Sequence, residues 1–201
     1  MTKKYNAGIT SHALWLQEFK LGVSLYLDGK SADEIKAASD EENIFQMTTA
    51  DRAKRASRNI VRRITSLPVS VIEIFPHLDI SNQKLVALLS MMLTNPLVDD
   101  FVYEVYRNEI VLGDRILEPR EVRAFFIKKQ MESEQVSVWT DKTTRRVMNA
   151  VLSILRDAGL LRKPTSNIAN GDEVLKPYLS FDLVNVMKET GLTRELAALG
   201  G

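Results

Sequence analysis

The residues best suited to chemistry in this sequence are the cations and amides of the stretch TDKTTRRVMNAVLSILRDAGLLRK, residues 140–163. Arginine can donate two hydrogen bonds to guanine, and asparagine can pair in the same bidentate way with adenine, in the major groove of DNA. Threonine hydroxyls and the free N–H groups of a first helical turn suit phosphate oxygens. The composition of this stretch therefore favours contact with a nucleic acid.

The same stretch has the period of an amphipathic helix over residues 141–158, capped by Thr140 or Asp141 and ended by Gly159. Its apolar stripe is expected to be buried. The stripe comprises Val147, Val151, Ile154, Leu155 and Ala158, with Met148 and Leu152 beside it. The candidate DNA contacts are Lys142, Arg145, Arg146 and Asn149 on the opposite face, together with Thr143 and Thr144 in the first turn. The alternative is a surface helix whose basic face is merely solvated.

After Leu161 the pattern predicts a loose β-hairpin with Asn170-Gly171 at its turn. A helix, a basic helix and a returning hairpin in this order are typical of a winged helix-turn-helix. In that fold the N-terminal half of the second helix reaches the bases, and the hairpin forms the wing. Arg162, Lys163 and Lys176 are then expected to contact the DNA backbone.

A second basic helix is predicted in TADRAKRASRNIVRRITSLP, residues 49–68. Its inward face is expected to hold Ala53, Ala56, Ile60, Ile64 and Leu67. Its candidate DNA contacts are Arg52, Arg55, Arg58, Asn59, Arg62 and Arg63. The alternative is that these arginines pair with the acidic stretch 28–42 inside the fold, and some of the cations, Arg52 and Lys54 among them, are expected to do so.

The charge of the chain is distributed in blocks, although the net charge is only +1. Residues 28–42 hold six acids and two lysines, whereas residues 51–63 hold six bases and one acid. Residues 99–114 hold five acids and one arginine, and residues 141–163 hold six bases and two acids. Local sign asymmetry of this kind points to a charged working surface more than the total does.

The sequence predicts a cytoplasmic protein without a membrane segment. It contains no cysteine, which fits a reducing compartment and excludes disulfides and thiolate zinc sites. The N-terminus has no apolar signal core. The longest apolar run, residues 85–93, is much shorter than the ~20 residues that a bilayer span needs.

No catalytic or cofactor site is expected, and the chain is predicted not to be an enzyme. His12 and His77 lie far apart without ligand spacing, so neither metal binding nor base catalysis is expected of them. Gly29-Lys30-Ser31 imitates the end of a phosphate-binding loop, but the glycine required five positions earlier is Ser24. Asp99-Asp100 is interpreted as complementing a helix dipole.

The rest of the chain is predicted to be mainly α, a helical bundle with winged helix-turn-helix elements and the small hairpin near its C-terminus. Caps and breakers delimit helices at 12–28, 31–38, 48–66, 69–76, 81–94, 96–112, 119–131 and 180–190. Three domains are predicted. Residues 1–68 form a helix-turn-helix-like domain, 69–115 a helical connector, and 116–201 a winged helix-turn-helix-like domain.

The chain also resembles a known family. The segments YNAGITSHALWLQEFKLGVSLYLDGKSADEIK, LSMMLTNPLVDDFVYEVYRNEI and DKTTRRVMNAVLSILRDAGLL together resemble the BrxA family of BREX bacteriophage-exclusion systems. The resemblance implies a small helical, non-catalytic DNA-binding component that acts beside an adenine methyltransferase, a large ATPase and a phosphatase-like protein. It transfers no catalytic residues.

The sequence therefore predicts a DNA-binding accessory protein of phage defence, with duplex DNA and other BREX subunits as partners and a possible homo-oligomer. Two alternatives stay open. One is a protein-interaction adaptor whose charged blocks dock onto other defence subunits. The other is an RNA-binding helical protein.

Overall fold

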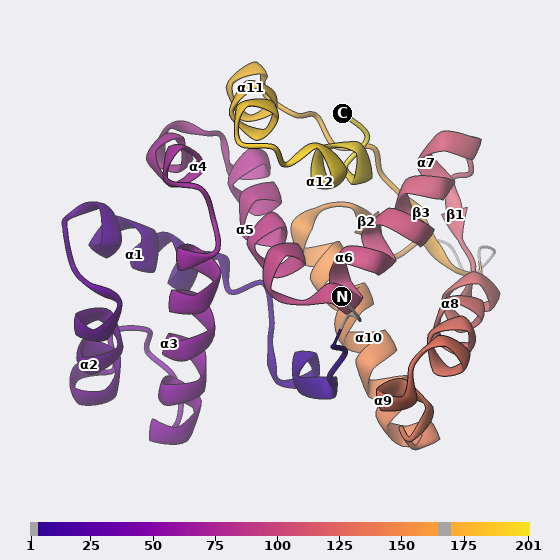
Figure 1. Ribbon diagram of the computed structural model, residues 1–201, viewed down its shortest axis with the longest axis horizontal. Helices are drawn as coiled ribbons and strands as arrows, with labels where there is room; N and C mark the ends of the chain where they lie inside the picture. Colours follow the sequence, from indigo (N-terminus) through magenta and orange to yellow (C-terminus); the bar gives the residue numbers. More distant parts are fainter. Residues whose placement is uncertain (1–3, 165–169) are drawn as a thin grey trace.

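The computed structural model describes residues 4–164 and 170–201, and these are mainly helical, as the sequence predicts (Figure 1). The first half contains η1 (Ala7–Ser11), α1 (Leu16–Leu27), α2 (Ala32–Glu42), α3 (Ala50–Thr65), α4 (Val69–Ile74), η2 (Phe75–His77) and α5 (Ile80–Thr94). The second half contains α6 (Pro96–Phe101), α7 (Arg107–Leu112), β1 (Ile116–Leu117), α8 (Pro119–Glu132), α9 (Glu134–Ser137), α10 (Asp141–Ala158), β2 (Leu161–Arg162), β3 (Asp172–Val174), α11 (Phe181–Glu189) and α12 (Thr193–Ala198).

The helices α1, α2 and α3 pack together at one side of the molecule (Figure 1). The capping box predicted at Ser31 and Glu34 is present, and α2 continues four residues beyond the predicted end at Ala38. Gly22 permits the close approach of α1 to α3, since a Cβ there would lie 2.8 Å from Ile64 Cδ1 and 2.9 Å from Ile60 Cγ2. The close packing of α3 on α1 therefore requires a residue without a Cβ atom at position 22.

The centre of the molecule is α5, whose side chains from Leu85 to Met92 are buried. Asn95 caps the following helix with Pro96 at its first position, as predicted. That helix is not uniform, because residues Val102–Tyr106 form a π-helical turn between α6 and α7. Local sequence rules do not reveal this turn, and such π-turns often lie at functional sites.

The C-terminal part surrounds a small antiparallel sheet with the strand order β1-β3-β2. The strands β2 and β3 form the predicted hairpin, with Leu161 opposite Val174 and Arg162 opposite Glu173. The strand β1, which adds to this hairpin, and the helix α12 were not predicted. Much of the predicted hairpin loop, residues 165–169, lies outside the described residues.

Gly171 has a different role from the one predicted. It directly precedes β3, and an added Cβ would lie 2.4 Å from the carbonyl oxygen of Leu117. Glycine is therefore required for the approach of β1 to β3.

Nearly all buried apolar side chains of the described residues form one cluster that extends from Ile9 to Leu199. The three-domain division of the sequence stays a prediction. No single helix in the described ranges is long and apolar enough to cross a bilayer. The segments Ile80–Thr94 and Pro96–Leu112 reach that length and composition only as a pair bent by 114°.

Candidate nucleic-acid interface

The helix α10 has the predicted boundaries and the predicted faces. The Thr140 hydroxyl accepts a hydrogen bond from the Thr143 amide, and Gly159 ends the helix with a φ of 83°. The apolar stripe is buried against α5, η1 and β2. The exposed residues of the opposite face are Lys142, Arg145, Arg146, Asn149 and Ser153.

The cations in the N-terminal half of α10 form no ion pair with the described residues. Within the part of the chain that the structure describes, Lys142, Arg145 and Arg146 form no ion pair. Thr143 and Thr144 are half-buried, and Gln130 donates to the Thr144 hydroxyl at 3.4 Å. The side chains that face solvent at this end of α10 are therefore predominantly basic.

The hairpin supplies fewer free cations than the sequence suggests. Arg162 is exposed, but its guanidinium donates two hydrogen bonds to Glu173 at 2.7 and 2.9 Å. Lys163 and Lys176 are exposed. Arg156 joins α10 to β3 through a bidentate pair with Asp172, at 2.6 and 2.9 Å, which fixes the helix against the sheet.

The helix α3 also presents an exposed basic stripe. Arg52, Arg55, Arg58 and Arg62 are exposed, and none of them forms an ion pair with a described residue. Two acids of the stretch 28–42 pair locally instead, in Lys30–Glu34 at 3.9 Å and Lys36–Asp33 at 3.0 Å, and none of its acids pairs with a described residue of α3. The structure therefore contradicts the alternative in which this acidic stretch neutralises the arginines of α3.

Arg63, in contrast, is buried, so the prediction that it contacts DNA is wrong. Its side chain is 0% exposed. The guanidinium donates to Ser90 Oγ at 3.0 Å and to the carbonyl oxygens of Leu14 at 2.9 Å and Ala87 at 3.0 Å, and it lies over the Phe19 ring. Burial lowers the pKa of Arg63 to about 9, which leaves it charged at neutral pH. It joins α3, α1 and α5.

The prediction for Asn59 is wrong for the same reason, because this side chain of α3 is buried against the segment before α1. Its Nδ2 atom lies 3.4 Å from both ring nitrogens of His12. Its Oδ1 atom is buried without a hydrogen-bond partner among the described residues. The predicted adenine-type contact is therefore not available on α3, whereas Asn149 of α10 is exposed.

His12 is expected to make the protein sensitive to acid. Burial first, and then the charges of Arg62 and Arg63, lower the pKa of His12 from 6.5 to about 4. The folded state therefore binds this proton less tightly than the unfolded state, whose histidine pKa is about 6.5. Stability that is fully present above pH 6.5 is lost as the pH falls from about 6.5 towards 4. Urea unfolding should show that the free energy of unfolding falls by up to ~2 kcal/mol over this pH range, and the fall should be smaller in His12→Gln. An equal loss in both proteins would contradict the assignment to His12.

A cavity of about 320 Å³ lies beside the basic stripe of α3. It is lined by Thr10, Ser11, His12, Ala13, Trp15, Arg52 and Arg55. Trp15 has a φ of 48°, in the left-handed region that bulky residues rarely occupy. No local sequence pattern predicts this backbone conformation at Trp15.

The acids at the start of α6 do more than complement a helix dipole. Lys129 lies 3.3 Å from Asp100 and 2.7 Å from Glu104, and its side chain is only 4% exposed. Arg194 pairs with Asp99 at 3.1 Å and with Asp100 at 3.2 Å. The Tyr5 hydroxyl donates to Asp100 at 2.6 Å. This buried network connects both ends of the chain to α6 and α8, away from the basic faces.

The chain matches the model of the BrxA family over residues 3–191. The chain belongs to the BrxA family. It is 31% identical over 187 residues to the BREX protein BrxA of Bacillus cereus (strain H3081.97), which covers 93% of this chain and 92% of that protein. The resemblance seen in the sequence is thus confirmed, and membership of the BrxA family makes the chain a component of a phage-defence system.

The backbone is similar to that of a solved structure as well. An uncharacterized protein from Magnetospirillum magneticum matches with a TM-score of 0.78, at 18% identity and with 98% of each chain covered. At this identity the likeness shows a shared fold alone. The assignment of a molecular activity within the BrxA family therefore depends on the site.

Proposed function

We propose that this BrxA-family protein is a non-catalytic component of BREX that binds duplex DNA, with α10 as the helix that enters the major groove. The observation that carries the proposal is the group of exposed cations in the N-terminal half of α10 that form no ion pair with any residue in 4–164 or 170–201. Lys142, Arg145 and Arg146 all lie within its first two turns. Cations that form no ion pair with the protein attract a polyanion. Exchanging their hydration water for phosphate oxygens costs little free energy, because no internal ion pair is broken.

The elements around α10 support a winged helix-turn-helix interpretation of the C-terminal part. The chain passes from β1 through α8 and α9 to α10, and it returns through β2 and β3. The sheet order β1-β3-β2 places the hairpin beside the C-terminal end of α10. In proteins of this design the second helix meets base edges with its N-terminal residues. Asn149 and Arg145 are the base contacts that we propose.

The basic stripe of α3 is proposed as a second, sequence-independent contact. In Figure 1, α3 and α10 run upward from the lower edge of the molecule, with η1, the indigo turn, between them. The exposed cations of α10 lie toward its N-terminal end, whereas those of α3 extend from Arg52 in its first turn to Arg62 in its last. One duplex laid along this edge would meet both stripes.

Two further partners belong to this proposal. Membership of a BREX system makes the methyltransferase, ATPase and phosphatase-like subunits candidate protein partners. RNA is the alternative ligand, because a basic stripe does not by itself distinguish the two polyanions. A gel shift of a labelled duplex, with RNA as the competitor, separates them: efficient competition by RNA at equal nucleotide concentration would favour the RNA alternative.

DNA affinity is expected to depend strongly on salt. If about six phosphates are neutralised, log K should fall with log[salt] at a slope near −5. Fluorescence anisotropy of a labelled duplex between about 50 and 200 mM salt measures this slope. A slope near zero would mean that the basic stripes do not contact phosphates, and it would leave the adaptor alternative in place.

A further inference from the structure

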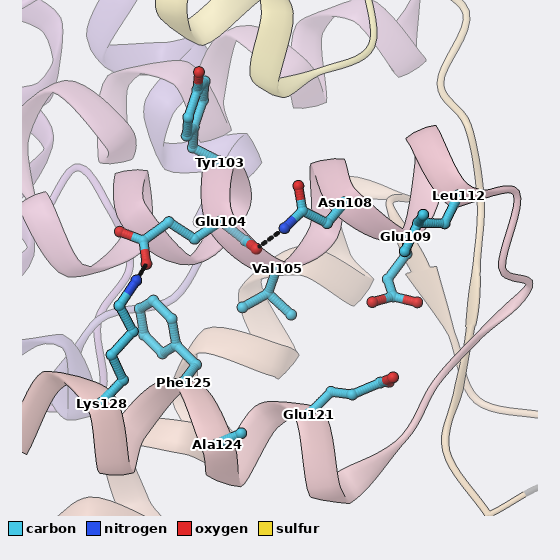
Figure 2. A pocket seen from close by; sticks show the side chains of 10 residues that line it. All are labelled: Tyr103, Glu104, Val105, Asn108, Glu109, Leu112, Glu121, Ala124, Phe125 and Lys128. Atoms are coloured by element: carbon cyan, nitrogen blue, oxygen red, sulfur yellow. Dashed lines mark hydrogen bonds and ion pairs between the residues drawn. The ribbon is translucent and has the colours of Figure 1, made fainter.

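A groove with an acidic wall lies between α7 and α8, apart from the basic stripes (Figure 2). Its volume is about 500 Å³. Tyr103, Val105 and Leu112 line it from the π-helical turn and α7, and Ala124 and Phe125 line it from α8. We refer to these residues, together with Glu109 and Glu121, as the α7–α8 groove. At one end of the groove Glu104 is paired with Lys128, and at the other end Glu109 and Glu121 supply negative charge only.

Glu109 is the unusual residue of this groove. It is 6% exposed, and its Oε2 atom is buried without a hydrogen-bond partner among the described residues. Figure 2 shows its carboxyl group pointing into the space between the two helices, towards Glu121. A buried carboxylate normally has a cation or several donors beside it, because otherwise its desolvation is not compensated.

The charges nearest to Glu109 are negative, so they add to the cost of ionising its buried carboxyl group. Burial first, and then the charges of Glu121, Asp114 and Glu118, raise the pKa of Glu109 to about 7. Glu121 is already occupied with the backbone amide of Glu118 at 2.7 Å. Lys128, the cation of the groove, pairs with Glu104 at 3.0 Å. No described basic side chain pairs with Glu109, so the groove lacks a positive charge at its acidic end.

The shape and composition of the groove indicate which cation would fit. The described residues contain no group of three or more His, Cys, Asp or Glu side chains arranged to hold a metal ion. The apolar walls suit an aliphatic stem, and the carboxyl end suits a guanidinium or ammonium head. The rim includes an exposed apolar side chain, since Leu112 lines the groove and is 75% exposed. A free amine would leave this rim in water, whereas a polypeptide would cover it.

We propose that the α7–α8 groove is a docking site for an arginine or lysine side chain of another polypeptide, with Glu109 as its ion-pair partner. This interaction is independent of DNA binding, because the acidic end of the groove repels phosphate. It assigns to the chain two separate surfaces of opposite charge, one for a nucleic acid and one for a basic protein segment.

The test is a titration of the ¹⁵N-labelled full chain at pH 8 with the peptide acetyl-Leu-Arg-Leu-amide, followed by NMR. The expected result is saturable shifts of the amides of Asn108, Leu112 and Ala124. Glu109→Gln should weaken this binding at least tenfold, whereas Glu73→Gln, the same change at an exposed site on α4, should leave it unchanged. The same peptide with citrulline in place of arginine should bind at least tenfold more weakly, because citrulline keeps the shape and loses the charge.

Several results would overturn the proposal. The absence of saturable shifts at these amides, or equal binding of the arginine and citrulline peptides, would remove the ion pair. Equal affinity of wild type and Glu109→Gln would do the same. Butylguanidinium that binds as tightly as the peptide would show a small-molecule site and contradict the polypeptide partner.

The Glu109→Gln variant is expected to fold and to be more stable than wild type at pH 8. A raised carboxyl pKa means that the folded state holds a proton more tightly, so its stability falls as the pH rises from about 4.5 to 7. Glutamine abolishes that fall, and the melting temperatures of the two proteins should converge near pH 4.5. Peptide binding by wild type should weaken from pH 8 to pH 6 as Glu109 gains its proton. The variant should bind duplex DNA as wild type does.

Discussion

The double variant Arg145→Ala/Arg146→Ala is expected to bind duplex DNA about 10- to 100-fold more weakly than wild type at about 100 mM salt. Both guanidinium groups are exposed and without an ion pair among the described residues, so their loss removes contacts with DNA and leaves internal contacts intact. Fluorescence anisotropy with one labelled duplex measures the change. The circular dichroism spectrum and the melting temperature should stay those of wild type.

A matched control removes the same charge elsewhere. Arg115 and Lys188 are exposed and form no ion pair within residues 4–164 and 170–201. The variant Arg115→Ala/Lys188→Ala should therefore lose affinity by only a small factor, through the change in net charge alone. If both double variants bind equally well, α10 is not the recognition helix, and the adaptor alternative becomes the better account of the basic stripes.

Arg63→Ala is expected to lower the free energy of unfolding by about 4 kcal/mol. The substitution opens a void in the interior, it removes the donor to the buried carbonyl oxygen of Leu14, and it removes one of the two side-chain donors to that of Ala87. Urea unfolding followed by circular dichroism measures the loss. Arg63→Lys should recover only part of it, because one ammonium group cannot reach all three acceptors in the geometry of a guanidinium.

The neighbouring residue provides the control for this prediction. Arg62 is exposed, whereas Arg63 is fully buried. Arg62→Ala should change stability by less than about 0.5 kcal/mol and should weaken DNA binding, so adjacent substitutions separate the two effects. A stability loss of less than about 1 kcal/mol in Arg63→Ala would contradict the structural role of this arginine.

The positions of most helices follow from local chemistry and could be predicted. Ser31, Asn95, Thr140 and Ser180 begin helices because their side chains accept backbone N–H groups that would otherwise lack partners. Gly159 ends α10 because glycine adopts a positive φ without strain. The two faces of α10 were equally predictable, since its apolar residues repeat with the period of the helix.

The helix α3 shows where prediction from one helix fails. A helical wheel predicts Asn59 on the exposed face of α3 and Arg63 beside that face. In the structure α3 packs against α1, α2 and α5, which bury a wider face than a single apolar stripe would indicate. Arginine can occupy such a position only when acceptors from other segments surround it, and here these lie before α1 and on α5.

The sequence by itself determined the helical class, most helix ends and the basic face of α10, because each depends on neighbouring residues or on residues one turn apart. It also determined the family, because three long segments of the chain carry the resemblance. The tertiary structure alone decided which arginines of α3 are free, where β1 joins the sheet, and that Glu109 is buried without a cation. Burial and ion pairing depend on residues distant in the chain that folding brings together. Local rules assign the faces of a helix, and the packing of its neighbours decides which of those faces meets water.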